Sequence, residues 1–119
     1  MKYAMLVYSD QSSWEELSDE ESARLRAESM PRWITLFEEM GKADPNVTGK
    51  ELEGTSEAKV VRVVDGQTIV TDGPFAETKE QLGGVFVTEL PDLDEAIRLA
   101  ALVPAADYGT LEIRPLATR

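Results

Sequence analysis

The chain has 119 residues, and its 12 Lys and Arg against 23 Asp and Glu give a formal net charge of −11 at pH 7. It contains no Cys and no His, which excludes disulfides, thiol nucleophiles, imidazole bases and metal sites built on either ligand. The acidity also argues against a nucleic-acid partner, because phosphate binding needs a basic surface.

The length fits one domain, so we expect a single domain over residues 1–119. No apolar stretch approaches the ~20 residues that a membrane span needs. The first residues form an apolar run that is too short for a secretory signal and lacks a cleavage pattern. We therefore expect a cytoplasmic protein that contacts neither membrane nor nucleic acid. No metal-ligand spacing occurs, and we expect no metal and no cofactor.

The first third of the chain predicts a strand and a long helix. The nearly continuous apolar run from Tyr3 to Tyr8 is typical of a buried central strand. Ser18 followed by Glu21 is a capping-box pattern, which starts a helix that runs to about residue 40 with Gly41 as its stop. Pro31 should kink or divide this helix. Its expected buried stripe consists of Met30, Trp33, Ile34, Phe37 and Met40.

The middle of the chain predicts a loop and then a β-hairpin. Residues 44–55 read as loop with at most a short strand. Lys59–Val64 and Gln67–Asp72 are strand-like and flank Asp65-Gly66, a pair that tolerates the positive φ of a type I′ turn. This turn pairs Val64 with Gln67, which places Lys59 directly opposite Asp72.

The last third predicts two strands around a second helix. Gly83-Gly84 marks a turn or a close backbone approach, and Val85–Glu89 is the next strand. Asp92 caps a helix that ends before Pro104. The last strand is expected over residues 108–114. The second helix should bury Leu93, Ala96, Ile97 and Ala100.

The order is strand, helix, short strand, hairpin, strand, helix, strand. Without the hairpin this is the ferredoxin-like βαββαβ unit, so the predicted fold class is α+β. Two helices should cover one face of an antiparallel sheet. The other face is then uncovered in a monomer, and it must be polar or meet a partner.

The run Thr71–Gly84, TDGPFAETKEQLGG, closely resembles the signature of the YCII-related family, in its Asp-Gly-Pro-Phe branch. Both ends of the chain are also similar to that branch. The resemblance implies a homodimer through the sheet face, a dimeric α/β barrel. Some members of the wider family have a His-Asp pair proposed as catalytic, which a chain without His cannot have. Genes of this branch look like frequent neighbours of sigma-factor genes in bacterial genomes. The resemblance therefore implies a regulatory or accessory role.

Asp72 and Phe75 are candidate site residues within this signature. Asp72 ends a strand beside a Gly and a Pro, where a partly desolvated carboxylate could act as a general base. A cross-strand ion pair with Lys59, or an Asx-turn, explains the same residue without chemistry. Phe75 could line a substrate pocket or serve as a buried anchor. Glu77, Lys79 and Glu80 could form a lid or a solvated turn.

The last strand and the end of the first strand supply the other candidates. In the last strand Thr110, Glu112 and Arg114 should point away from the helices, toward the interior between subunits. Glu112 and Arg114 are then candidates for substrate binding, with Arg114 as an anion clamp, although a salt bridge explains them as well. Tyr8 could donate a proton or simply pack.

Three functions fit these patterns. The first, which the resemblance implies because a lactone dehalogenase belongs to the wider family, is a cofactor-free enzyme that abstracts a proton from, or eliminates a group from, a small acidic substrate, with Asp72 as its base. The second is a non-enzymatic ligand-binding or regulatory accessory protein linked to sigma-factor transcription. The third is a homodimer without a ligand.

Overall fold

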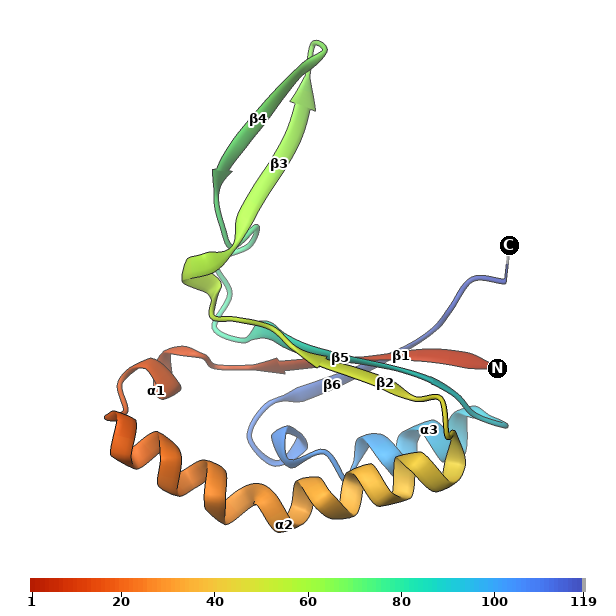
Figure 1. Ribbon diagram of the computed structural model, residues 1–119. Coiled ribbons are helices and arrows are strands. Elements are labelled where there is room, and N and C mark those ends of the chain that lie inside the picture. The colour runs from red at the N-terminus through yellow and green to blue at the C-terminus, as the bar shows by residue number, and fades with distance from the viewer. Residues whose placement is uncertain (119) are drawn as a thin grey trace.

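A computed structural model describes residues 1–118 of the chain (Figure 1). One antiparallel sheet has the strand order β2-β5-β1-β6, and β3 pairs with β4 in a second sheet. The strands are β1 (Lys2–Ser9), β2 (Thr48–Glu51), β3 (Lys59–Val64), β4 (Gln67–Asp72), β5 (Gln81–Glu89) and β6 (Thr110–Pro115). The helices are α1 (Ser12–Glu15), α2 (Asp19–Ala43) and α3 (Leu93–Ala100), with short 3₁₀ turns at Thr55–Glu57 and Pro104–Asp107.

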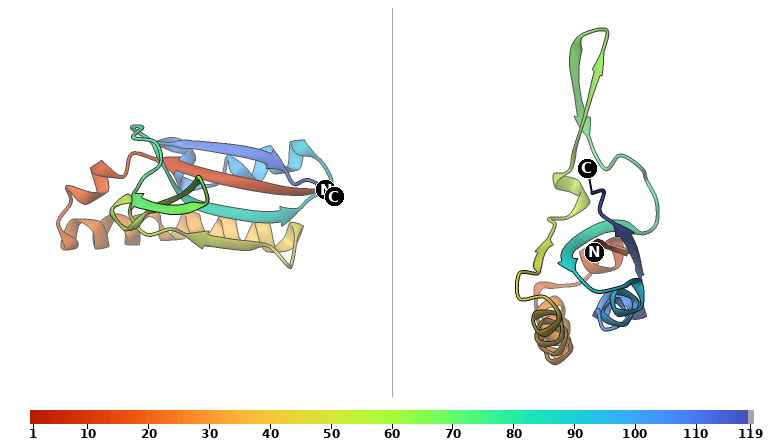
Figure 2. Two further views of the ribbon diagram at one scale, coloured as in Figure 1. Left: turned by 90° about the horizontal axis from the view of Figure 1, so that it is seen from above. Right: turned by 90° about the vertical axis from the view of Figure 1, so that its right-hand side faces the viewer.

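The four-stranded sheet has the ferredoxin-like order, with the β3–β4 hairpin inserted between its second and third strands. Helices α2 and α3 lie together on one side of this sheet, as the side view in Figure 2 shows. The α+β fold with two helices on one face is therefore confirmed. Among residues 1–118 the sheet stays open, with β2 and β6 at its edges, and the single chain forms no closed barrel.

Strict alternation along β1 separates the core from the uncovered face. Tyr3 and Met5 are almost fully buried against the helix layer, while Ala4, Leu6 and Tyr8 point to the opposite face. Because β1 lies between β5 and β6, the same alternation decides which residues of those two strands face the helices. The core comprises Tyr3, Met5, Leu36, Met40, Phe86, Leu90, Ala96, Leu99, Ala100, Val103 and Ala105.

The hairpin has the predicted turn and register. Asp65 and Gly66 have φ values of 50° and 78°, the left-handed region that a type I′ turn requires. Val64 pairs with Gln67, and Lys59 pairs with Asp72. The hairpin stands away from the four-stranded sheet, on the side without helices (Figure 1). We call residues 59–72 the arm.

Helix α2 starts as predicted but ends later. Glu21 N–H donates to Ser18 Oγ at 3.1 Å, and the capping box is complete. Gly41 lies inside the helix, which ends at Ala43 with Asp44 as its C-cap, so the expected stop at Gly41 is wrong. Pro31 does not divide the helix either. Its missing N–H leaves a carbonyl on an exposed turn, where water can bond to it.

The predicted buried stripes are only partly right. On α2, Met40 is buried, but Met30, Ile34 and Phe37 are each about half exposed, and the core side is centred on Leu36 and Met40. Leu93 and Ile97 of α3 are likewise about half exposed, whereas Ala96 and Ala100 are buried as expected. Each helix carries a wider apolar band than one sheet face can cover, so part of the band remains outside.

The strands also begin earlier or later than expected. Gly83 and Gly84 lie inside β5, so the expected turn is wrong and the close backbone approach is right. A Cβ on Gly84 would lie 3.3 Å from the carbonyl oxygen of Lys50 on the neighbouring strand. The last strand starts at Thr110 instead of Tyr108, because a 3₁₀ turn precedes it.

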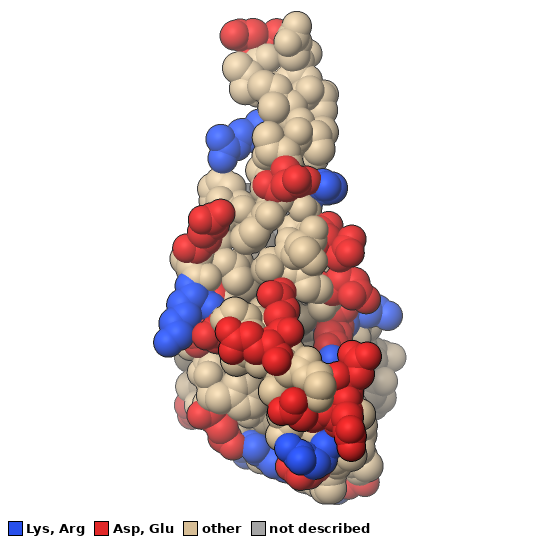
Figure 3. All heavy atoms as spheres, turned by 90° about the vertical axis from the view of Figure 1, so that its left-hand side faces the viewer, with Lys and Arg blue, Asp and Glu red and all other residues tan. Residues whose placement is uncertain are grey.

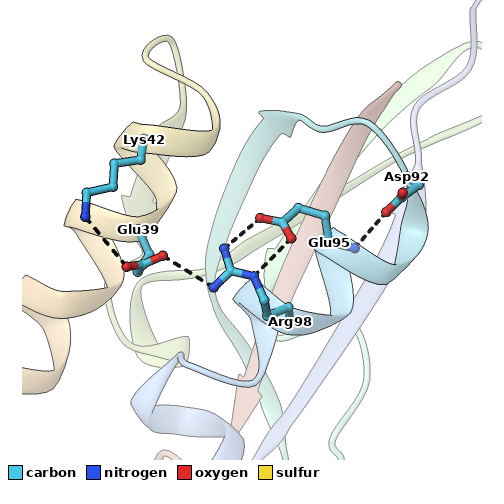
Figure 4. A network of polar contacts seen from close by, with 5 residues as sticks. All are labelled: Glu39, Lys42, Asp92, Glu95 and Arg98. Atoms are coloured by element: carbon cyan, nitrogen blue, oxygen red, sulfur yellow. Dashed lines mark hydrogen bonds and ion pairs between the residues drawn. The ribbon is translucent and has the colours of Figure 1, made fainter.

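Arg98 joins the two helices (Figure 4). Its guanidinium donates twice to Glu95, with Nε–Oε2 at 2.9 Å and Nη2–Oε1 at 2.6 Å, in the fork geometry that suits carboxylates. Its third nitrogen donates to Glu39 of α2 at 3.3 Å. Asp92 caps α3 as predicted, since its side chain accepts from the N–H of Glu95. The charged groups therefore fix α3 against α2 at the surface, beside the apolar core.

Asp44 fixes the end of α2 to the sheet. Its buried carboxylate accepts hydrogen bonds from the backbone N–H of Glu89 at 2.9 Å, the N–H of Asn46 at 3.0 Å and the hydroxyl of Thr88 at 3.2 Å. The bond from Glu89 contributes most to lowering the pKa of Asp44 below its ordinary value of 3.8, followed by that from Asn46. The residue is therefore ionised in the folded chain near neutral pH.

We expect Asp44→Asn to lower the free energy of unfolding by about 1–3 kcal/mol at neutral pH. One of the two accepting oxygens becomes an amide nitrogen, which cannot accept the hydrogen bonds made to it. The pKa of Asp44 is lower in the folded chain than in the unfolded one. The contribution of this carboxylate to the free energy of unfolding is thus fully present above about pH 3.8, and it is lost as the pH falls through the pKa of the folded chain. Urea unfolding should show the gap between variant and wild type narrowing below about pH 4. Glu53→Gln, which changes an exposed carboxylate, serves as the control, and an equal loss in both variants would contradict the assignment.

Candidate functional site

A hollow of ≈ 660 Å³ opens where β1 ends. Three segments that are distant in the sequence form its walls: the end of β1, the loop before β5 and the turn into β6. The β-sheet brings them together, since Tyr8 pairs with Thr110 on one side and with Leu82 on the other. We call this site the Tyr8 hollow, and its lining residues are Tyr8, Asp10, Thr78, Lys79, Glu80, Tyr108 and Thr110.

The loop before β5 is held in place by side chains. Gln81 Nε2 donates to the carbonyl oxygens of Ala76 at 2.7 Å and Thr78 at 2.9 Å. The hydroxyl of Thr110 donates to the carboxylate of Glu80, 3.0 Å from each oxygen. These bonds join the loop to both β5 and β6. They give Lys79, which lies between them in the sequence, a defined place in the wall of the hollow.

The charges and hydroxyls of the hollow can both donate and accept hydrogen bonds. The hydroxyl of Ser12 is the main cause that lowers the pKa of Asp10, and the ammonium of Lys79 acts in the same direction. Partial burial raises the pKa of Tyr108, so its phenol stays protonated and can donate. Within residues 1–118 the hydroxyls of Tyr8 and Tyr108 make no hydrogen bond to the protein. Both phenols are therefore available to a bound molecule.

Tyr8, Glu112 and Arg114 share the uncovered face but not one site. Tyr8 pairs with Thr110, whereas Arg114 pairs with Ala4, four residues away along β1 and thus about 13 Å from the Tyr8 end. Arg114 Nε lies 3.4 Å from the carboxylate of Glu112, which is the salt bridge considered as the structural alternative. Only Tyr8 of these three lines the hollow.

Asp72 and Phe75 lie at the base of the arm. The Asp72 carboxylate forms an ion pair with the ammonium of Lys59, the cross-strand partner expected from the register. Its side chain is 86% exposed. Phe75 is 78% exposed beneath the guanidinium of Arg62, 5.6 Å from the ring centre, so the expected buried anchor is wrong. In this chain the structure does not bring either residue into the Tyr8 hollow.

Asp10 and Tyr108 line the hollow but were not anticipated from the sequence. Asp10 lies in a polar turn, and Tyr108 precedes β6 outside any regular element. Neither position has a motif, and only the pairing of β1 with both β5 and β6 makes them neighbours. Of the three charged residues after the signature's Phe, Lys79 and Glu80 line the hollow and Glu77 does not.

Over residues 1–118 no three Asp or Glu side chains come together as a metal site would require. The same part of the chain has no helix with the length and apolarity to cross a membrane.

The comparisons with known proteins give the family. The family model described as YCII-related domain matches residues 1–118. An uncharacterized protein of Rhizobium meliloti (strain 1021) is 40% identical to this chain over an alignment of 119 positions. The alignment covers 98% of this chain and 93% of that protein. The chain belongs to the YCII-related family.

Proposed function

We propose that this protein binds a small polar molecule in the Tyr8 hollow and acts in the cytoplasm as a homodimer of single-domain chains. The observation that carries the proposal is that two tyrosines, Tyr8 and Tyr108, line one hollow beside charged groups of both signs, Asp10 and Lys79. Convergent polar groups with aromatic walls are typical of small-molecule sites.

The chemistry of the wall indicates the class of ligand. Tyr8, Tyr108 and Lys79 are donors, and the carboxylate of Asp10 is an acceptor. A molecule with a carbonyl or carboxylate group and a hydroxyl nearby can bond to both kinds of group. Short hydroxy acids and hydroxylated lactones have this pattern. Binding without turnover would also suit a regulatory accessory protein that works with a sigma factor.

The uncovered sheet face supports the proposed dimer. Its centre is apolar, formed by Ala4 and Leu6 of β1 with Val85 and Val87 of β5, which pair across the two strands. Around it lie charges of both signs, and an apolar centre with a polar rim is typical of protein interfaces. Charges of both signs let the same patch pair with itself across a two-fold axis. The rim consists of Lys2, Lys50, Glu89, Glu112 and Arg114.

We expect ligands from a panel of hydroxy acids and lactones to raise the melting temperature of the wild type. In ¹H–¹⁵N spectra they should shift the amide signals of residues 8–10, 78–80 and 108–110. Tyr8→Phe removes one donor and should weaken binding about fivefold to tenfold, the effect of one hydrogen bond. Tyr3→Phe is the matched control, because Tyr3 is buried on the helix side of β1. Ligands that shift only signals outside the hollow would refute the proposed site.

Turnover of the bound molecule is the enzymatic form of this proposal, with Asp72 as general base. It requires the Asp72 carboxylate to leave Lys59 and the base of the arm to approach the ligand. We expect Asp72→Asn to abolish turnover of a ligand that the panel identifies while leaving its binding unchanged, because an amide cannot accept the proton. Turnover that survives in Asp72→Asn would exclude this residue as the base.

The dimer has its own test. Light scattering at micromolar concentration should give the mass of two chains for the wild type. Leu6→Asp places a charge at the centre of the uncovered face and should give monomers, since a buried unpaired charge costs several kcal/mol. Ile97→Asp, on the outer side of α3, should remain dimeric. A monomeric wild type would contradict the dimer and leave the ligand site untouched.

A further inference from the structure

The arm extends out of the body of the protein. The radius of gyration is 16.4 Å, whereas a compact chain of this length would have about 13–14 Å. Two of the three principal extents, 47 and 46 Å, are more than twice the third, 20 Å. Figure 1 and the right-hand view of Figure 2 agree that the arm has open space around most of its length. Its base is joined to the body by short segments, where Gly73 N–H donates to the carbonyl of Ala58 at 2.8 Å.

A two-stranded sheet in this position lacks the support that such sheets need. An isolated hairpin is marginally stable in water, and a third strand or a packed surface is usually required. Val61 pairs with Val70 and Val63 with Thr68, so three valines lie on one face of the arm. These valines are 59–69% exposed. We call Val61, Val63 and Val70 the valine face.

The opposite face of the arm is equally apolar but less exposed. It carries Val60, Val64 and Ile69 beside Arg62, Gln67 and Thr71. Val60 is partly buried, and Val64 and Ile69 are 48% and 43% exposed, less than each residue of the valine face. The valine face is thus the part of the arm that gains most from being covered.

The charge of the arm fits an acidic partner better than the rest of the surface does. The chain as a whole carries −11, but the arm has two cations, Lys59 and Arg62, against two carboxylates, Asp65 and Asp72. Figure 3 shows a largely uncharged stretch between the acidic tip and the charged base, while red side chains crowd the body below. A second copy of this acidic chain would meet little repulsion at the arm.

The direction of the arm matches the uncovered sheet face. It rises on the side of the sheet that has no helices, the side on which a partner would lie (Figure 1). Each arm strand has six residues, about 20 Å in length. Face-to-face sheets pack about 10 Å apart, so an arm of this length passes the partner's sheet and reaches its helix layer. A partner on the uncovered face would therefore have the arm beside it.

We infer that the valine face of each arm packs against a second copy of this chain, so that two arms clasp the dimer. The inference rests on the proposed dimer and adds a second contact surface to it. Because the dimer is two-fold, each arm contact occurs twice. We choose a second copy of this chain as the partner for two reasons. The arm rises on the side of the proposed interface, and it carries no net charge, whereas the whole chain carries −11.

The experiment compares dimer dissociation constants by analytical ultracentrifugation. In Val61→Thr/Val70→Thr the β-branched shape is kept and the apolar contact is lost, so the hairpin should persist while the dissociation constant rises at least tenfold. Val64→Thr makes the same change on the other face and should leave the constant within about twofold. Hydrogen exchange of the β3 and β4 amides should be slow in the wild-type dimer and at least tenfold faster after dilution to monomer.

Each outcome decides the inference. An unchanged constant in the double variant overturns it, and the sheet-face dimer then stands alone. Arm amides that exchange fast in the dimer overturn it as well. Arm amides that are equally slow in the monomer show that the arm is stable by itself or covered by its own chain, and they also overturn it. If Leu6→Asp leaves the dimer intact while the double variant dissociates it, the arm contact stands and the sheet-face contact falls.

Discussion

In β1 each residue that faces the helices is followed by one that faces the other way, and the strand lies at the centre of the sheet. Tyr3 and Met5 enter the core, so Ala4, Leu6 and Tyr8 must lie on the side that α2 and α3 do not cover. This one-sided cover places Thr110, Glu112 and Arg114 on that same side through the pairing of β6 with β1. The Tyr8 hollow and the proposed interface both depend on it.

Local chemistry made the hairpin and the helix starts predictable. Asp65-Gly66 can adopt positive φ at both positions, and this alone sets the register that pairs Lys59 with Asp72. The end and the buried side of α2 could not be predicted in the same way. They depend on Asp44 bonding to β5 and on how much of a wide apolar band the sheet can cover, and both are tertiary effects.

The site shows the same division between local and tertiary information. The alternation of the last strand put Thr110, Glu112 and Arg114 on one face, because period two is a property of the strand itself. The pairing of β6 with β1 adds Tyr8 to that face. The separation of Arg114 from Tyr8 along the sheet needed the register between β1 and β6. Asp72 is prominent in the signature, but its surroundings depend on the arm leaving the body, which no local pattern in residues 59–72 indicates. Asp10 and Tyr108 become neighbours only in the folded sheet.

The net charge of −11 and the proposed self-association are compatible because the charge is unevenly placed. Six carboxylates occupy the N-cap or the first turn of α2 and α3, where they stabilise the helix N-termini: Asp19, Glu20, Glu21, Asp92, Asp94 and Glu95. The uncovered face has three cations against two carboxylates in its rim, and the arm is balanced. Repulsion between two chains would therefore act mainly between helix ends on the far sides of the sheets, where salt screens charges beyond about 8–10 Å. The uncovered face and the arm are thus surfaces that a second acidic chain can approach closely.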